Sequence, residues 1–378
     1  MKMKNIASFF RENAVLTVAA LAALITAFIV PPDGEYAGYF DFRTLSCLFC
    51  TLAVVSALGR INFFYMLAKR IVAMFATLRS AVVALVWITF IGSMVIANDM
   101  ALITFLPLGY IVLSATGQQR HMAYVFVLQN IAANLGGMLT PFGNPQNLYI
   151  YTKFSVDTGE FMRIMVFPFL LSITLITACC LVLPKEPIRT DGETTGAPAW
   201  RQTVYIALFC VSIVAVFRII PFWVAPLVIV PSLLVLDRRA LLRVDYGLLF
   251  TFVFFFIFSG NMSRIPAVRD LISGVLEKNV LVVSALLCQF ISNVPSAILL
   301  SGFTDNYPEL LLGVNIGGVG SIIASLASLI TFREYCRHDP AGKRRYLLLF
   351  SAVNFSFLIV LLAFCSLLVF LGGVPATG

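Results

Sequence analysis

The stretch NLGGMLTPFGNPQNLYIY, from Asn134 to Tyr151, interrupts an otherwise apolar part of the chain. Pro141 and Pro145 lack a backbone donor and clash with the preceding turn, and glycines loosen the backbone on both sides. In a bilayer, non-helical backbone is tolerated only where it is buried in protein or lines a cavity. The stretch therefore predicts a transmembrane helix that is broken near the middle of the membrane.

Composition places this break in a membrane protein. Of 378 residues, 60% are hydrophobic and 12% are charged, whereas a soluble domain carries about 25% charged residues. The net charge of +8 comes from short basic clusters between apolar stretches, which is the pattern of the positive-inside rule rather than of nucleic-acid binding. The eight cysteines lie mostly in apolar segments and there are two histidines, so we expect neither a metal site nor another cofactor.

Basic residues also orient the first half of the chain. Lys2, Lys4 and Arg11 precede the first apolar span, 14–30, and the loop after that span has no basic residue. This places the N-terminus in the cytoplasm. A span over 44–58, an amphipathic interfacial helix over 59–78, an apolar region over 80–117, the broken helix over 121–151 and a returning span over 161–183 follow.

The region 80–117 is interrupted at Asn98-Asp99 and has Arg79 and Arg120 at its two ends. Basic residues at both ends indicate that it enters and leaves on the same face. A re-entrant hairpin with Asn98-Asp99 at its tip is favoured, and two ordinary spans joined by a very short turn are the alternative.

The second half repeats this order. After spans over 203–220, 222–236 and 246–259 come an interfacial helix over 260–278, a hairpin over 280–303 with Ser292-Asn293 at its tip, a Gly/Ser-rich segment over 310–331 and a last span over 346–371. Charge placement puts the second hairpin on the opposite face, so the halves are inverted and the C-terminus lies outside. Inverted repeats are the arrangement used for alternating access.

Direct alignment supports the repeat. Asn134 faces Asn315, Gly136-Gly137 face Gly317-Gly318, and Thr140 faces Ser321. The predicted divisions are 1–79 (spans and interfacial helix of repeat 1), 80–183 (hairpin, broken helix and closing span), 184–202 (a cytoplasmic linker), 203–279 (connecting span, spans and interfacial helix of repeat 2) and 280–378 (hairpin, broken helix and closing span).

Two broken helices and two hairpin tips are expected to converge near the midplane. Helix starts there attract anions, and freed carbonyl groups coordinate cations. The alternative is that the small residues only allow close helix packing, and it weighs more for the second site, which lacks the proline pair. The first predicted site comprises Asn98, Thr140, Gly143, Asn144 and Asn147, and the second Ser292, Asn293, Gly320, Ser321, Ser325 and Ser328, with Na⁺ ligands expected at Asn98, Gly143 and Asn293.

Asp99 is the one acidic residue expected deep within an apolar run. An acid inside the membrane is costly, so it is a functional candidate. It could carry a proton, bind sodium or cap a half-helix, or the predicted boundary could be misplaced. No arginine is expected at the midplane, so an anion would be held by helix dipoles and amide groups.

The motifs ANDMALITFLPL (97–108) and NLGGMLTPFGNPQN (134–147) resemble the ion transporter superfamily, which includes citrate and dicarboxylate symporters, arsenite-efflux permeases and related sodium/proton antiporters. The segments SNVPSAILLSGF and LLLGVNIGGVGSIIASLASLITF are similar to its permease branch. The resemblance implies a scaffold domain that often dimerises and a transport domain that moves as an elevator. The tips depart from the Ser-Asn-Thr of dicarboxylate symporters, and an acidic tip such as Asp99 is closer to the arsenite and antiporter branches.

We therefore expect an all-α polytopic inner-membrane protein, a secondary transporter of a small anion (a di- or tricarboxylate or an inorganic oxyanion) coupled to Na⁺ or H⁺. A Na⁺/H⁺ antiporter of the same fold and an arsenite or antimonite efflux permease are the transport alternatives. A lipid-modifying enzyme would need a nucleophile–base pair or a metal cluster, which the sequence does not offer. A purely structural scaffold does not explain two polar breaks at matching places. The expected partners are the anion, the bilayer and a second copy of the chain.

Overall fold

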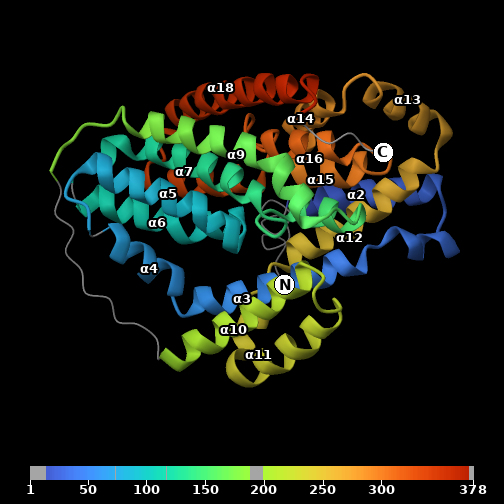
Figure 1. Ribbon diagram of the computed structural model, residues 1–378, viewed down its shortest axis with the longest axis horizontal. Helices are drawn as coiled ribbons and strands as arrows, with labels where there is room; N and C mark the ends of the chain where they lie inside the picture. The colour runs from blue at the N-terminus through green and yellow to red at the C-terminus, as the bar shows by residue number, and fades with distance from the viewer. Residues whose placement is uncertain (1–13, 73, 116, 188–198, 374–378) are drawn as a thin grey trace.

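The computed structural model describes residues 14–72, 74–115, 117–187 and 199–373, and this part of the chain is almost entirely helical (Figure 1). Most of the predicted linker 184–202, and the basic residues before the first span, lie outside the described residues. Within the described ranges, six helices are long and apolar enough to cross a membrane. The predicted polytopic α-helical class is confirmed.

The helices follow the order of two repeats joined by one connecting helix. The first repeat holds α2 (Ala14–Ile29), α3 (Phe42–Arg60), α4 (Phe63–Val72), α5 (Leu78–Ile96), α6 (Asn98–Ala115), α7 (Met122–Gly136), α8 (Pro145–Lys153) and α9 (Thr158–Cys180). After α10 (Ala199–Val216), the second holds α11 (Val224–Leu242), α12 (Tyr246–Ser263), α13 (Pro266–Leu276), α14 (Val280–Ile291), α15 (Asn293–Leu300), α16 (Tyr307–Ile316), α17 (Leu326–His338) and α18 (Lys343–Phe370).

Several predicted boundaries shift. Gly59 lies within α3 and Gly260 lies within α12, so both interfacial helices begin later than expected. Arg238 and Arg239, expected in a loop, continue α11 beyond a kink at Asp237, whose side chain forms an ion pair with Arg60 at 2.7 Å. This half-buried partner on α3 holds Asp237 at the kink, beyond which the helix continues through the basic run.

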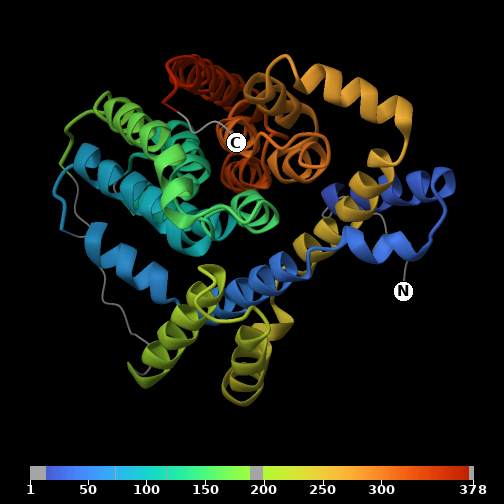
Figure 2. The same ribbon diagram turned by 45° about the vertical axis from the view of Figure 1, so that its right-hand side comes forward.

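The helices form two groups (Figures 1 and 2). One group contains α2, α3, α10, α11 and α12, with α2 packed along α12 and α3 packed along α11. Each of these pairs consists of one helix from the first repeat and one from the second. The other group contains both hairpins and both broken helices, and α4 and α13 run between the groups as separate arms. The arms are short and amphipathic in sequence, as expected for helices at the membrane interface.

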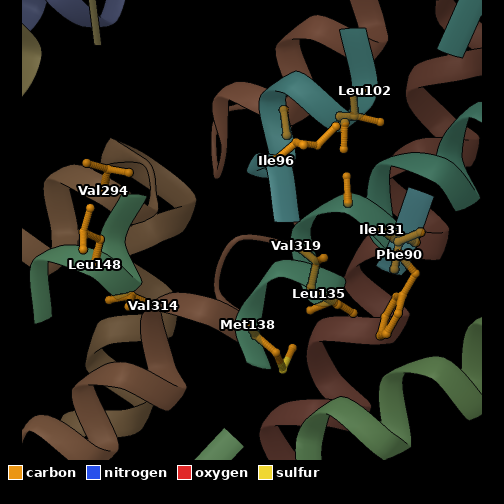
Figure 3. Close-up of a cluster of buried hydrophobic side chains, with 14 of the residues drawn as sticks. Phe90, Ile96, Leu102, Ile131, Leu135, Met138, Leu148, Val294, Val314 and Val319 are labelled. Carbon is orange, nitrogen blue, oxygen red and sulfur yellow. The ribbon is translucent and has the colours of Figure 1, made fainter. Parts of the chain in front are cut away.

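The core of the hairpin group draws on both repeats. Apolar side chains of Phe90, Leu135, Val294 and Val319 belong to one buried cluster (Figure 3). Because the cluster includes residues of both breaks and both hairpins, most of the backbone of the unwound segments packs against protein, although Ile323 of the second break is exposed. This is the condition under which a bilayer tolerates non-helical backbone.

Candidate functional site

The two hairpin tips have the same backbone geometry. Ala97 (φ 65°, ψ 153°) ends the first arm and Ser292 (φ 76°, ψ 160°) ends the corresponding arm of the second hairpin. These angles are sparsely populated by residues other than glycine and cost about 1–3 kcal/mol each. The asparagine that follows each strained residue is buried, and its Oδ1 accepts the next backbone N–H at 2.9 Å.

Both tips turn inside the protein. The Asn98 amide donates to Asn134 Oδ1 at 3.3 Å, and the Asn293 backbone N–H donates to the carbonyl of Ala324, in the second break, at 2.9 Å. Each turn thus lies beside a helix break in the middle of the helical group. This placement, with both tips inside the helical group, is the one expected of re-entrant hairpins.

The first break is held by one carboxamide. The chain leaves the helix at Gly137 and resumes it at Pro145, which frees the carbonyl groups in between. Asn147 Nδ2 donates to the carbonyls of Gly137, Met138 and Thr140 at 3.1–3.2 Å. Buried carbonyl groups without a donor are destabilising, so Asn147 makes the unwound geometry stable.

The second break is held in the same way by Gln289, on the hairpin arm α14. Its Nε2 donates to the carbonyls of Gly317 and Val319 at 2.9 and 3.2 Å, and its Oε1 accepts the Ser321 N–H at 2.7 Å. Gly320 has φ 123°, a conformation open mainly to glycine. The helix is unwound from Gly317 to Ser325, so this segment breaks fully without the proline pair.

A pair of hydroxyl groups confirms the register of the repeat. Thr140 Oγ1 donates to the carbonyl of Met94 at 2.7 Å, and Ser321 Oγ donates to the carbonyl of Gln289 at 2.8 Å. Met94 and Gln289 stand at the same distance in sequence before Asn98 and Asn293, respectively. The predicted pairing of Thr140 with Ser321 therefore places equivalent atoms in equivalent contacts.

The other predicted residues of the breaks also have structural partners. A Cβ on Gly143 would lie 2.3 Å from the Gly137 carbonyl oxygen, so only glycine fits there. Ser325 caps α17 by accepting the Ser328 N–H at 3.1 Å. Asn144, at the equivalent cap of α8, donates instead to Asn315 Oδ1 at 3.2 Å.

Sequence reasoning did not assign Asn134 or Asn315 to the site, although it paired them at the start of the two breaks. Asn315 Nδ2 donates to Asn147 Oδ1 at 2.6 Å, which joins the two breaks directly. Each of the two asparagines also donates to the carbonyl four residues earlier, as a helical side chain does. Their equivalence in the alignment was the available signal.

A cavity of about 240 Å³ lies where the tips and breaks meet α12. Of the predicted residues, Asn98, Asp99, Ser292 and Asn293 line it, whereas the eight predicted residues of the breaks surround it without lining it. Sequence reasoning missed several lining residues: Pro145 and Gln146 of α8, Leu326, Leu329, Ile330 and Arg333 of α17, and Asp245, Gly247, Leu248 and Thr251 at the start of α12.

Residues at five helix N-termini line this cavity, namely those of α6, α8, α12, α15 and α17. Each N-terminus carries the equivalent of about +0.5 elementary charge from its unpaired N–H groups, so together they contribute roughly +2.5. Asp99 and Asp245 contribute two negative charges and Arg333 one positive charge. The site therefore stays electropositive when both carboxylates are ionised.

Arg333 corrects one expectation. The sequence placed it in a basic cytoplasmic loop and predicted no arginine at the membrane midplane. In the structure α17 continues to His338, and Arg333 lies two turns from its start, on the cavity wall. The helix continues because Leu326–His338 contains no proline or glycine after the break.

Oxygen atoms with unused acceptor capacity gather on the first-repeat side. Asp99 Oδ1, Asn144 Oδ1 and Gln146 Oε1 are buried and accept no hydrogen bond from any described residue. Buried acceptors normally have a donor or a cation. No cluster of three or more His, Cys, Asp or Glu side chains suited to a metal ion occurs among the described residues.

Inverted hairpins, paired breaks and a cavity lined by asparagine and aspartate side chains at their junction define the chain as a membrane transporter of the inverted-repeat class. A family model described as "Citrate transporter" matches residues 6–316. The chain belongs to this citrate transporter family and is a multi-pass membrane protein.

Two relatives cover most of the chain. An uncharacterized transporter of Methanocaldococcus jannaschii is 29% identical over 328 residues, which are 86% of this chain and 90% of the relative. The inner membrane protein YbiR of Escherichia coli is 28% identical over 325 residues, which are 83% of this chain and 85% of that protein.

A solved structure shares the fold. The crystal structure of the Alcanivorax borkumensis YdaH transporter matches with a TM-score of 0.59 and 12% identity, over 90% of this chain and 89% of that one. At this identity the match supports the architecture alone.

Proposed function

We propose that this transporter moves a small anion, a di- or tricarboxylate or an inorganic oxyanion, in symport with Na⁺ or H⁺ by alternating access. The observation that carries the proposal is the cavity itself. Residues at five helix N-termini and Arg333 line a space that also has a buried asparagine from each hairpin tip in its wall. Anions are stabilised by helix N-termini and by arginine. The family description adds citrate as the first anion to test.

Asp99 is proposed as the coupling residue. It stands at the first tip, on the cavity wall, with a buried oxygen that accepts no bond from the described residues. Binding a proton or Na⁺ at this carboxylate would remove its repulsion of an incoming anion. The buried amide oxygens of Asn144 and Gln146, which also accept no hydrogen bond from the described residues, are the further ligands a sodium ion would use.

The two helix groups suggest how the site changes sides. The group with hairpins and breaks would be the transport domain, and α2, α3, α10, α11 and α12 would form the scaffold and the surface of a homodimer. The cavity lies on the boundary between these groups, so movement of one past the other would carry the site across the membrane. We place the protein in the inner membrane with its N-terminus in the cytoplasm and its C-terminus outside.

The test is flux in proteoliposomes. Citrate, succinate, phosphate, sulfate and arsenite are supplied one at a time, with a Na⁺ gradient, a pH gradient or neither. We expect gradient-dependent accumulation of at least one of them, and an Arg333→Gln variant should raise the KM of that anion. No accumulation of any of these anions under either gradient would refute the proposal.

A Na⁺/H⁺ antiporter is the second candidate, because two carboxylates, Asp99 and Asp245, line the same cavity. An antiporter would show Na⁺-dependent proton flux in liposomes that contain no transportable anion. That flux should then disappear in the Asp99→Asn variant. Transport of arsenite alone from the panel would favour the efflux-permease alternative.

A further inference from the structure

The cavity has a mouth on one face of the protein, at the seam between α12 and α17. Asp245 caps the start of α12, where its Oδ1 accepts the Leu248 N–H at 2.9 Å. Arg333, on α17, lines the cavity with it, and both residues are exposed. Arg243 precedes Asp245 and Arg337 follows Arg333, and both belong to the basic clusters that mark the cytoplasmic side in the predicted topology.

The inverted repeat has an equivalent seam on the opposite face. Asp41 caps α3 as Asp245 caps α12, with its Oδ1 accepting the Thr44 N–H at 3.0 Å. The helix α8 is the equivalent of α17, because both resume after the breaks at matching caps. In that register Thr152 corresponds to Arg333, and Lys153 is the next residue.

A pocket of about 460 Å³ lies at this second seam. Asp41 and Arg43 line it from α3, and Thr152 and Lys153 line it from α8. It thus has a cap aspartate in the place equivalent to Asp245, and a cation, Lys153, one residue after the position equivalent to Arg333, with Arg43 as a second cation. None of these four residues has a role in the site described above.

The second seam differs in being closed toward the centre, and Tyr149 closes it. Its hydroxyl group lies 2.8 Å from Ser301 Oγ, and its ring packs on Phe256 at 5.6 Å between centroids. Ser259 of α12 also donates to the Ile298 carbonyl of α15 at 3.0 Å. At the first mouth the residue equivalent to Tyr149 is Ile330, which lines the open cavity.

We propose that the pocket beside Asp41 and Lys153 is the outer mouth of the anion path, equivalent by the inverted repeat to the mouth beside Asp245 and Arg333. It joins the central site when Tyr149 separates from Ser301 and Phe256. The two cations then attract the anion from outside, as Arg333 does from inside. This inference rests on the proposed alternating-access transport of an anion.

The first test compares the two faces with radiolabelled citrate. In the Lys153→Gln variant the KM for citrate added outside whole cells should rise roughly tenfold, the scale of electrostatic attraction in charged clefts. The KM at the cytoplasmic face, measured in inside-out vesicles, should stay within about twofold of wild type. The matched control is Lys278→Gln, an exposed lysine of the second repeat, for which both values should stay unchanged. Equal effects of Lys153→Gln on both faces, or none on either, would overturn the proposal.

The second test needs no transport. A membrane-impermeant maleimide is added to cells, or to inside-out vesicles, that carry a variant with Lys153→Cys, an exposed position of the pocket, with the wild-type chain as background for its own cysteines. Labelling from outside supports the outer mouth, and labelling only from the cytoplasmic face, or from neither face, overturns it. If wild-type protein moves no citrate while Lys153→Cys is labelled from outside, the anion assignment fails and the position of the mouth stands.

Discussion

Replacing Asn147 with alanine tests whether one carboxamide holds the first break open. Its Nδ2 has two protons shared among three carbonyl groups at 3.1–3.2 Å, and its Oδ1 accepts from Asn315 at 2.6 Å. This amounts to about three effective hydrogen bonds at about 1 kcal/mol each in soluble proteins, and about 0.6 kcal/mol each in membrane helices. The variant should therefore lose about 2–3 kcal/mol of unfolding free energy.

The assay is reversible unfolding of the purified protein in mixed detergent micelles. Ser356→Ala is the control, since it removes one exposed hydrogen bond to Ala352 and should change stability by less than about 0.5 kcal/mol. Asn147→Asp should cost more than Asn147→Ala, because it keeps the shape but aims oxygen atoms at carbonyl oxygens. If Asn147→Ala matches the control, or is more harmful than Asn147→Asp, the account of the break is wrong.

Three further predictions follow from the tips and the ends of the scaffold. Asp99→Asn should abolish the dependence of anion accumulation on the driving gradient, measured in proteoliposomes. If the dependence is unchanged, Asp99 is not the coupling residue. Ala97→Gly and Ser292→Gly should each stabilise the protein by about 1 kcal/mol, because glycine adopts the positive φ at these positions without strain. A loss of stability in the same unfolding assay would show that the backbone is not strained there. The hydrogen bond from Arg264 holds the pKa of Asp33 below its ordinary value of 3.8. The pair therefore stabilises the fold above about pH 4, and this stabilisation is lost as the pH falls further and Asp33 becomes protonated. Between pH 5 and pH 3 the midpoint temperature of thermal unfolding should fall less for Asp33→Asn than for the wild type.

Local backbone chemistry explains which features could be predicted from the sequence. Pro141, Pro145 and the flanking glycines oppose helix formation wherever they occur, so the first break was predictable. The hairpin tips were predictable because polar residues interrupt long apolar runs. The pairing of the repeats followed from the order of these local features, and the matching contacts of Thr140 and Ser321 confirm it.

The features that escaped prediction depend on contacts between distant segments. The second break is stabilised by Gln289 from a different helix, which no local pattern in residues 317–325 reveals. Asp245 reaches the cavity only because α12 packs against the hairpin group. Arg333 was assigned to a loop because basic residues near a span end usually face the cytoplasm, whereas here the helix continues and places it on the cavity wall.

The bond between Asn147 and Asn315 has a consequence for engineering. It ties the two breaks together across the centre of the hairpin group, with Asn144 reinforcing the same junction. The start of α8, which lines the cavity, is thus linked by hydrogen bonds to the end of α16, where the second break begins. The adjustable wall is α12, where Gly247 and Thr251 face the cavity without belonging to that junction. Efforts to change which cargo the protein accepts should randomise that wall first and leave the asparagines untouched.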